Sequence, residues 1–227
     1  MKTKNDIVIL YEDNHLVVVN KPAGTLVQGD STGDETLADQ VKVYIKHKYH
    51  KPGEVFLGVV HRLDRPVSGA VVFARTSKAL ERMNALFRDR DVRKTYWALV
   101  KDRPPQSQDT LIHWLKKDHK TNKATAFNKE LQGTKKAELF YKLIGRIAEY
   151  YLLEITPLTG RPHQIRVQLA KMGCPILGDL KYGAGKANKD GNIHLHSREL
   201  EFIHPVKKTA LRVTARLPKD NIWQLFQ

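Results

Sequence analysis

The sequence predicts an α/β protein of the α+β type, with a central mixed, largely antiparallel sheet and flanking helices. Apolar, mostly β-branched runs at residues 7–11, 16–19, 59–60 and 70–74 are typical of buried strands. Short turn signals such as Glu12-Asp13-Asn14 separate neighbouring runs. Such turns join antiparallel strands, whereas a doubly wound parallel sheet requires long crossover connections.

Two helices are expected in the first half of the chain. Thr36 and Asp39 have the spacing of a capping box, which predicts that a helix begins there. Ser77 is expected to cap the second helix. The helical spacing of apolar residues predicts the buried positions, which are Leu37, Val41, Ile45 and Tyr49 in the first helix and Leu80, Met83 and Phe87 in the second.

The second half is expected to add strands at 95–100, 137–145, 149–156, 195–202 and 209–217, the second and third of them as a hairpin. A helix is expected between Pro162, in its first turn, and Gly173, which closes it. The residues expected to face the core from this helix are Ile165, Leu169 and Met172. Those left toward solvent or a cleft are Arg161, Gln164 and Arg166.

Residues 116–136 contain seven lysines against Asp118 and Glu130 and have few apolar side chains. We interpret this stretch as an exposed hairpin or ordered loop that contacts an RNA backbone and contributes nothing to the core. A flexible, solvated loop is the alternative.

Composition points to an acidic partner. The 227 residues carry a net charge of +15, for which nucleic acid is the commonest partner. Cys174 is the single cysteine, so no internal disulfide can form and a reducing compartment, the cytoplasm, is expected. No apolar run approaches the length of a membrane span, so no membrane association is expected.

The segment 59–74 contains the most informative residues. Two apolar runs flank a turn punctuated by Pro66, Ser68 and Gly69, and Asp64 lies in it between Arg62 and Arg65. Two neighbouring cations favour the charged carboxylate, so Asp64 is expected to be ionised, exposed on a loop and facing an electropositive groove. The alternative is a purely structural Arg–Asp–Arg clamp.

The stretch His61-Arg62-Leu63-Asp64-Arg65, followed by Ser68-Gly69, resembles the signature of the RluA-type RNA pseudouridine synthases. Val67 stands where the family usually has Thr, and Pro162 where it has Thr or Ser. Further blocks that are similar to family motifs, in family order, are residues 20–24, 93–98, 158–166, 175–179 with 182–183, 195–196 and 204–205.

This resemblance implies one catalytic domain over residues 1–227, with a cleft across the middle of its sheet. Because the first expected strand begins near residue 7, the small N-terminal RNA-binding domain of many relatives is expected to be absent. The implied activity is the isomerisation of uridine in ribosomal or transfer RNA to pseudouridine after base flipping. The reaction requires no cofactor, and a monomer is the default.

The resemblance also implies roles for individual residues. Asp64 is the catalytic carboxylate, which attacks the ribose, attacks the uracil ring or abstracts a sugar proton; the sequence does not separate these routes. Tyr96 stacks on the extruded base and can move a proton. Arg166 keeps Asp64 ionised and oriented. The residues assigned to RNA contact are Lys21, Arg62, Arg65, Lys135, Lys136, Arg161, His163 and Gln164.

Other classes of function remain as alternatives. A non-catalytic RNA-binding or ribosome-assembly protein with the same fold would predict loss of the carboxylate or of Tyr96, and both are present. A hydrolase needs a second acid near the first, for which Glu154 and Asp179 are poor candidates. No metal site is expected, because the spacing of Cys174, His194 and His196 matches no zinc pattern.

Overall fold

The computed structural model describes residues 7–30, 32–118 and 120–227, and it divides into two compact units. The first unit contains the described residues up to Arg93 together with Ser197–Arg216. The second contains Lys94–His196 and Leu217–Gln227. No helix within the described ranges is long and apolar enough to cross a membrane.

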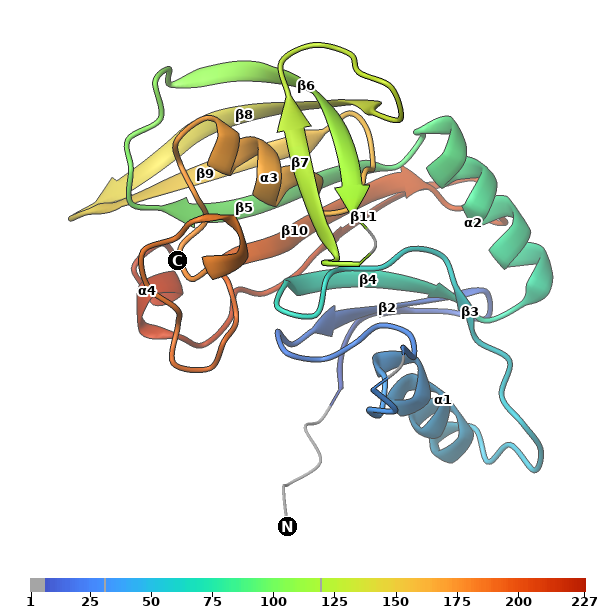
Figure 1. Cartoon of the computed structure of the whole chain (residues 1–227). Helices are drawn as coiled ribbons and strands as arrows, with labels where there is room; N and C mark the ends of the chain where they lie inside the picture. The colour runs from blue at the N-terminus through green and yellow to red at the C-terminus, as the bar shows by residue number, and fades with distance from the viewer. Residues whose placement is uncertain (1–6, 31, 119) are drawn as a thin grey trace. The chain divides into compact units, whose positions relative to one another are not determined.

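The sheet of the first unit has the strand order β1-β2-β4-β10, with β3 paired to β4 and β11 to β10 (Figure 1). Leu16–Val19 of β2 and all of β4 are buried, which explains why their sequences are continuous apolar runs instead of alternating ones. The bounds are β1 Val8–Glu12, β2 Leu16–Lys21, β3 Gly58–Val59, β4 Ser68–Ala74, β10 Leu195–Ile203 and β11 Ala210–Thr214.

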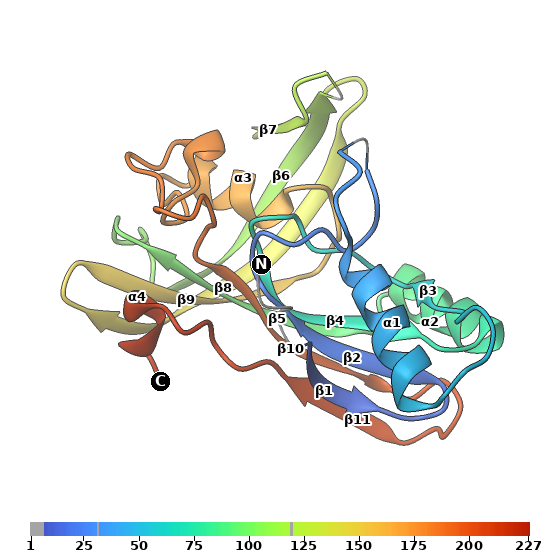
Figure 2. The same cartoon turned by 90° about the horizontal axis from the view of Figure 1, so that it is seen from below.

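Helices α1 (Leu37–Lys48) and α2 (Ser77–Asp89) belong to this unit, and α1 lies beside β2 in both views (Figures 1 and 2). The capping box is confirmed, since the Thr36 hydroxyl accepts from the Asp39 amide at 3.2 Å and the Asp39 carboxylate accepts from the Thr36 amide at 3.1 Å. The expected cap of α2 was wrong by one residue. Thr76 has the extended backbone of a cap and accepts from the Ala79 amide, whereas Ser77 is already helical.

The buried faces of these helices follow the predicted spacing with one exception. Met83 is fully buried, and Leu80 and Phe87 pack against the same cluster as partly buried side chains. Tyr49 was expected on the buried face of α1, but it follows the end of the helix and is 41% exposed. Its hydroxyl donates to Glu12 instead.

The second unit contains the strand order β5-β9-β8-β6-β7, in which every neighbouring pair is antiparallel. The largely antiparallel prediction and the β8–β9 hairpin are therefore confirmed. The bounds are β5 Arg93–Val100, β6 Gln108–Asp118, β7 Lys123–Phe127, β8 Lys135–Ile147, β9 Tyr150–Pro157, α3 Gln164–Lys171, the 3-10 turn η1 Leu180–Tyr182 and α4 Asn221–Gln224.

The lysine-rich stretch 116–136 is more ordered than its composition suggested. It forms the end of β6, all of β7 and the start of β8, and its short apolar residues alternate onto one face. The prediction that it adds nothing to the core was wrong. The small core that it builds with α3 and η1 comprises Leu115, Ala124, Ala126, Ala137, Val167 and Tyr182.

Helix α3 begins two residues later than predicted. Pro162 lies in the turn that precedes it, and His163 is its N-cap residue with a left-handed backbone, φ 54°. Ile165 and Leu169 are buried as expected, and Gly173 follows the helix with φ 88°. Figure 1 shows α3 beside β7, as the shared core requires.

Gly69 provides a test of how tightly β4 and β10 pack within the first unit. Its φ is +116°, and a Cβ atom would clash with the main chain of Ser197. We expect Gly69→Ala to lower the free energy of unfolding by about 3 kcal/mol or more, through backbone strain and overpacking. Gly53→Ala is the matched control, because no atom lies near its Cβ position. Equal stability of the two variants in urea denaturation would contradict this account.

Candidate active site

Asp64 occupies a tight turn that leads into β4. The Val67 amide donates to the Asp64 carbonyl at 3.0 Å, so residues 64–67 form the turn. Leu63 and Val67 on either side are buried. Asp64 itself was expected to be exposed, but it is half-buried. Ser68 and Gly69 were expected in the turn but belong to β4. Buried neighbours on both sides therefore fix the backbone of Asp64.

Lys21, at the end of β2, holds this turn from inside. Its side chain is wholly buried, and the ammonium donates to the carbonyls of Thr25, Pro22 and Arg65 at 2.7, 3.0 and 3.1 Å. Burial lowers the pKa of Lys21 to about 7, and the negative charge of Asp64 opposes this shift. Lys21 was expected to contact RNA; the structure shows it buried among three main-chain carbonyls, and its contact with RNA stays a prediction.

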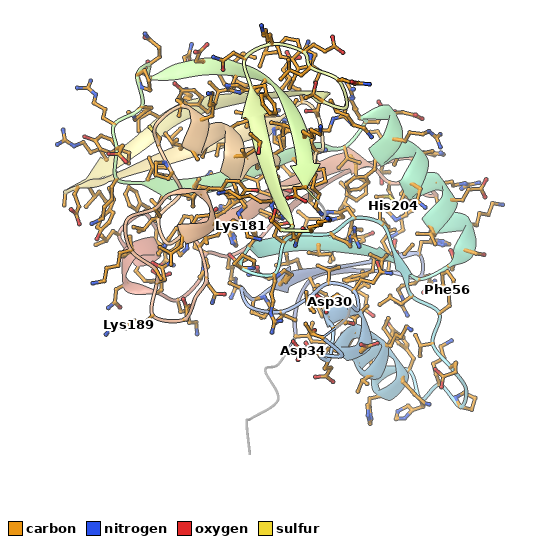
Figure 3. The ribbon with its side chains drawn as sticks, viewed as in Figure 1. Asp30, Asp34, Phe56, Lys181, Lys189 and His204 are labelled. Atoms are coloured by element: carbon orange, nitrogen blue, oxygen red, sulfur yellow. The ribbon has the colours of Figure 1, made fainter. Side chains whose placement is uncertain are left out.

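Arg62 and Arg65 are both exposed next to Asp64. Arg65 forms an ion pair with Asp34 at 2.9 Å, and its Nε donates to the carbonyl of Gly24 at 3.0 Å. The Gly24 amide in turn donates to the Arg65 carbonyl at 2.8 Å. Figure 3 labels Asp34 on the loop that follows β2. Arg65 therefore clamps the turn to the loop that follows β2, with Asp34 as an acidic partner.

Arg166 lies in α3 and is 6% exposed, although it was expected toward solvent or a cleft. Its guanidinium makes two parallel bonds to Asp179, Nε to Oδ2 at 2.7 Å and Nη2 to Oδ1 at 2.8 Å. The guanidinium also lies over the ring of Tyr182, 5.1 Å from its centre. Since Asp179 is fully buried against this cation, its carboxylate is a poor second acid for hydrolysis.

Gln164 was also expected toward solvent, yet it is buried and supports the loop before α3. Its Oε1 accepts from the Thr159 hydroxyl at 2.8 Å and from the Arg161 amide at 2.9 Å. Its Nε2 donates to the Glu138 carbonyl at 3.0 Å. These three bonds give Gln164 an internal role, so its expected exposure was wrong, while its contact with RNA stays a prediction.

Arg161 and His163 keep partly exposed positions beside this loop. Arg161 Nε donates to the carbonyl of Lys136 at 2.9 Å, at the start of β8. His163 Nδ1 lies 2.7 Å from the hydroxyl of Tyr182. Their contact with RNA stays a prediction, as does that of the exposed pair Lys135 and Lys136.

Tyr96 lies in β5 opposite Ile155 of β9 and is half-buried. Ala98, two residues further along the strand, is fully buried. Strand alternation places these two side chains on one face and Trp97 on the other. The position of Tyr96 on a rigid strand suits a stacking surface, and this role stays a prediction.

The residues considered for a metal have other surroundings. His194 packs on Trp223 at 5.6 Å between ring centres, and its Nε2 lies 3.3 Å from Asp220. Cys174 is buried, which raises the pKa of its thiol to about 11. In the parts of the chain that the structure describes, no group of three or more His, Cys, Asp or Glu side chains is placed to hold a metal ion.

Two residues that were not predicted to contact Arg166, Asp179 and Tyr182, lie next to it in the structure. Asp179 was considered only as a second catalytic acid, and Tyr182 was given no role. Their signal was the short turn Gly178-Asp179-Leu180-Lys181-Tyr182-Gly183, which follows α3. In this turn Asp179 and Tyr182 are buried, and Leu180 and Lys181 between them are exposed.

Lys21 yields a pH prediction. The unfolded chain binds the lysine proton up to about pH 10.5, whereas the folded chain releases it above about pH 7. Between these values the unfolded state holds more protons, so folding stability gained through Lys21 rises with pH. We therefore expect the free energy of unfolding of the wild type, minus that of Lys21→Met, to be larger at about pH 9 than at about pH 6.

Urea denaturation at both pH values measures this difference. Lys46→Met, at an exposed position in α1, is the control and should show no such trend. A wild-type advantage over Lys21→Met that stays constant with pH would contradict the buried, proton-releasing state of this lysine.

Comparisons with known proteins support the family resemblance found in the sequence. The model of the RNA pseudouridylate synthase family matches residues 15–171. Ribosomal large subunit pseudouridine synthase C of Buchnera aphidicola is 36% identical over 218 residues, which cover 92% of this chain and 67% of that protein. tRNA pseudouridine synthase C of Vibrio parahaemolyticus is 30% identical over 244 residues, which cover 96% and 93%.

A solved structure supports the same assignment. Human RNA Pseudouridylate Synthase Domain Containing 4 has a TM-score of 0.80 at 27% identity, covering 96% of this chain and 92% of that one. The chain spans about two thirds of the length of several ribosomal relatives and over nine tenths of several transfer RNA relatives. Because the family match extends over more than half of the sequence, the chain belongs to the RNA pseudouridylate synthase family, isomerases that act on RNA.

Proposed function

We propose that this chain converts uridine to pseudouridine at one or a few sites in ribosomal or transfer RNA, with Asp64 as the catalytic carboxylate. The observation that carries the proposal is the internal support of the Asp64 turn by Lys21 and by the loop around Gly24. A catalytic group must be held in a productive geometry, and buried hydrogen bonds to its backbone do this.

The reaction balances without a cofactor. The bond from ribose C1′ to uracil N1 breaks, the base rotates, and a bond from C1′ to C5 forms. The proton that leaves C5 is matched by the one that N1 gains. Asp64 can attack C1′, attack ring carbon 6, or remove a sugar proton to give a glycal, and all three routes stay open. Tyr96 is the proposed stacking partner of the extruded ring, and Arg166 the cation that orients Asp64.

The substrate must be opened before the base can react. Extruding a base costs a few kcal/mol, which contacts between phosphates and cationic side chains can offset. The net charge of +15 supports such contacts. The proposed contact residues that keep exposed or partly exposed side chains are Arg62, Arg65, Lys135, Lys136, Arg161 and His163.

The names of the relatives support both substrate classes. Ribosomal and transfer RNA synthases match this chain at 36% and 30% identity, so neither class is favoured. We further propose that the chain acts as a monomer in the cytoplasm. We also propose that both units belong to a single catalytic domain.

The decisive test is a pseudouridine map of cellular RNA from cells with and without the gene. Loss of one or a few sites in the deletion strain, restored by the wild-type gene, would support the proposal and name the substrate. If no site is lost, the purified protein is assayed on ribosomal and transfer RNA. Tight RNA binding without isomerisation would favour a non-catalytic RNA-binding protein instead.

Asp64→Asn should abolish isomerisation, because the amide keeps the shape but cannot act as nucleophile or base. The expected loss in single-turnover rate is on the order of 1,000-fold or more. RNA affinity should change little. Asp89→Asn, at an exposed position in α2, is the control and should retain full activity. Substantial activity in Asp64→Asn would remove this carboxylate from the mechanism.

Replacing Lys135 and Lys136 by Ala should weaken RNA binding and reduce its salt dependence. Each lost phosphate contact lowers the slope of log affinity against log salt by about one. Filter binding over a salt series measures the slope. The matched control is Lys101→Ala, an exposed lysine paired with Glu149 in the same unit. A slope equal to that of the wild type would assign the pair to a solvated surface.

A further inference from the structure

Tyr182 connects three segments of the second unit. It closes the turn η1, is 8% exposed, and packs into the small core with Val167 of α3 and Ala124 of β7. Its hydroxyl accepts from the amide of Ala124 at 2.9 Å. The same oxygen lies 2.7 Å from Nδ1 of His163, and the two rings meet edge to face.

The chemistry of these groups favours one arrangement of protons. The amide of Ala124 can only donate, so it occupies one acceptor position of the Tyr182 oxygen. When Tyr182 donates its own proton to Nδ1, the neutral imidazole of His163 carries its proton on Nε2. We expect this tautomer. It makes Tyr182 the link between a main-chain donor of β7 and the residue that caps α3.

The ring of Tyr182 contacts two cationic side chains. The guanidinium of Arg166 lies over it at 5.1 Å while Asp179 holds the same guanidinium through two hydrogen bonds. The Lys123 ammonium approaches the ring at 5.8 Å. Lys181, which precedes Tyr182 in η1 and is labelled in Figure 3, donates to the Asn122 carbonyl at 3.0 Å. This bond connects η1 to the β6–β7 turn.

We propose that Tyr182 is a positioning residue that sets the orientation of Arg166 and couples it to the basic β6–β7 hairpin. This inference rests on the proposed function, in which Arg166 orients the catalytic carboxylate. Asp179 fixes two nitrogens of the guanidinium, and the ring of Tyr182 fixes its plane. The hydroxyl keeps that ring in place through Ala124 and His163. Tyr182 acts through Arg166 and is not itself a catalytic residue.

The test compares Tyr182→Phe with the wild type under single-turnover conditions. The variant keeps the ring and loses both bonds of the hydroxyl. We expect the rate of isomerisation to fall about tenfold, since small errors in orientation are costly for catalysis. The dissociation constant for RNA should stay within about twofold, because no proposed RNA contact is removed. Tyr182→Leu, which also removes the ring, should lose more.

Tyr141→Phe is the matched control. Tyr141 is a buried tyrosine of the same unit, and its hydroxyl donates to the Gln106 carbonyl at 3.2 Å without a bond to α3 or η1. Thermal denaturation of both variants measures the stability cost of losing a buried hydroxyl. An unchanged rate in Tyr182→Phe would overturn the proposal. So would an equal loss of rate in Tyr141→Phe, which would indicate a general effect of stability.

A second readout is independent of activity. Nitrogen-15 NMR of the histidine rings reports the His163 tautomer, and the exchange rate of the Arg166 Nε proton reports how firmly the guanidinium is held. Both should change in Tyr182→Phe and not in Tyr141→Phe. If the wild type modifies no RNA, the proposed function fails while these signals still decide the positioning role. Unchanged signals in Tyr182→Phe would overturn it.

Discussion

The buried ion pair between Arg166 and Asp179 is the interaction on which the second unit depends. Moving a guanidinium and a carboxylate out of water costs several kcal/mol each, and only close, well-aligned bonds offset this cost. The two parallel bonds at 2.7 and 2.8 Å meet the requirement. Helix α3 and the turn that carries Asp179 must therefore stay together, because a buried charge left alone would destabilise the fold by about 3–5 kcal/mol.

The first unit applies the same principle to the turn of Asp64. There the buried charge is Lys21, and main-chain carbonyls replace a carboxylate as its partners. The buried side chains of Lys21, near Asp64, and of Arg166 are thus committed to internal contacts. In the proposed function, contact with RNA phosphates is therefore assigned to cations whose side chains lie at the surface, such as Arg62, Lys135 and Lys136.

Local signals explain what the sequence could predict. Patterns of neighbouring residues predicted the buried strands, the capping box at Thr36 and the β8–β9 hairpin, because each depends on residues close together in the chain. The burial of Lys21 and Gln164 could not be predicted in this way, because one acceptor of each comes from far along the chain, the Arg65 carbonyl for Lys21 and the Glu138 carbonyl for Gln164. A polar side chain on a helix looks solvent-facing until distant acceptors are placed around it.

The β6–β7 hairpin shows how one segment can pack into a core and still present a basic surface. Ala124 and Ala126 are small, so Tyr182 and Val167 approach the strand closely, while Lys116 and Lys123 are exposed. A basic surface on a packed strand loses less conformational freedom on binding RNA than the same lysines on a flexible loop would. The packing of Ala124 and Ala126, which the low apolar content of the stretch did not predict, therefore helps to pre-organise its charges.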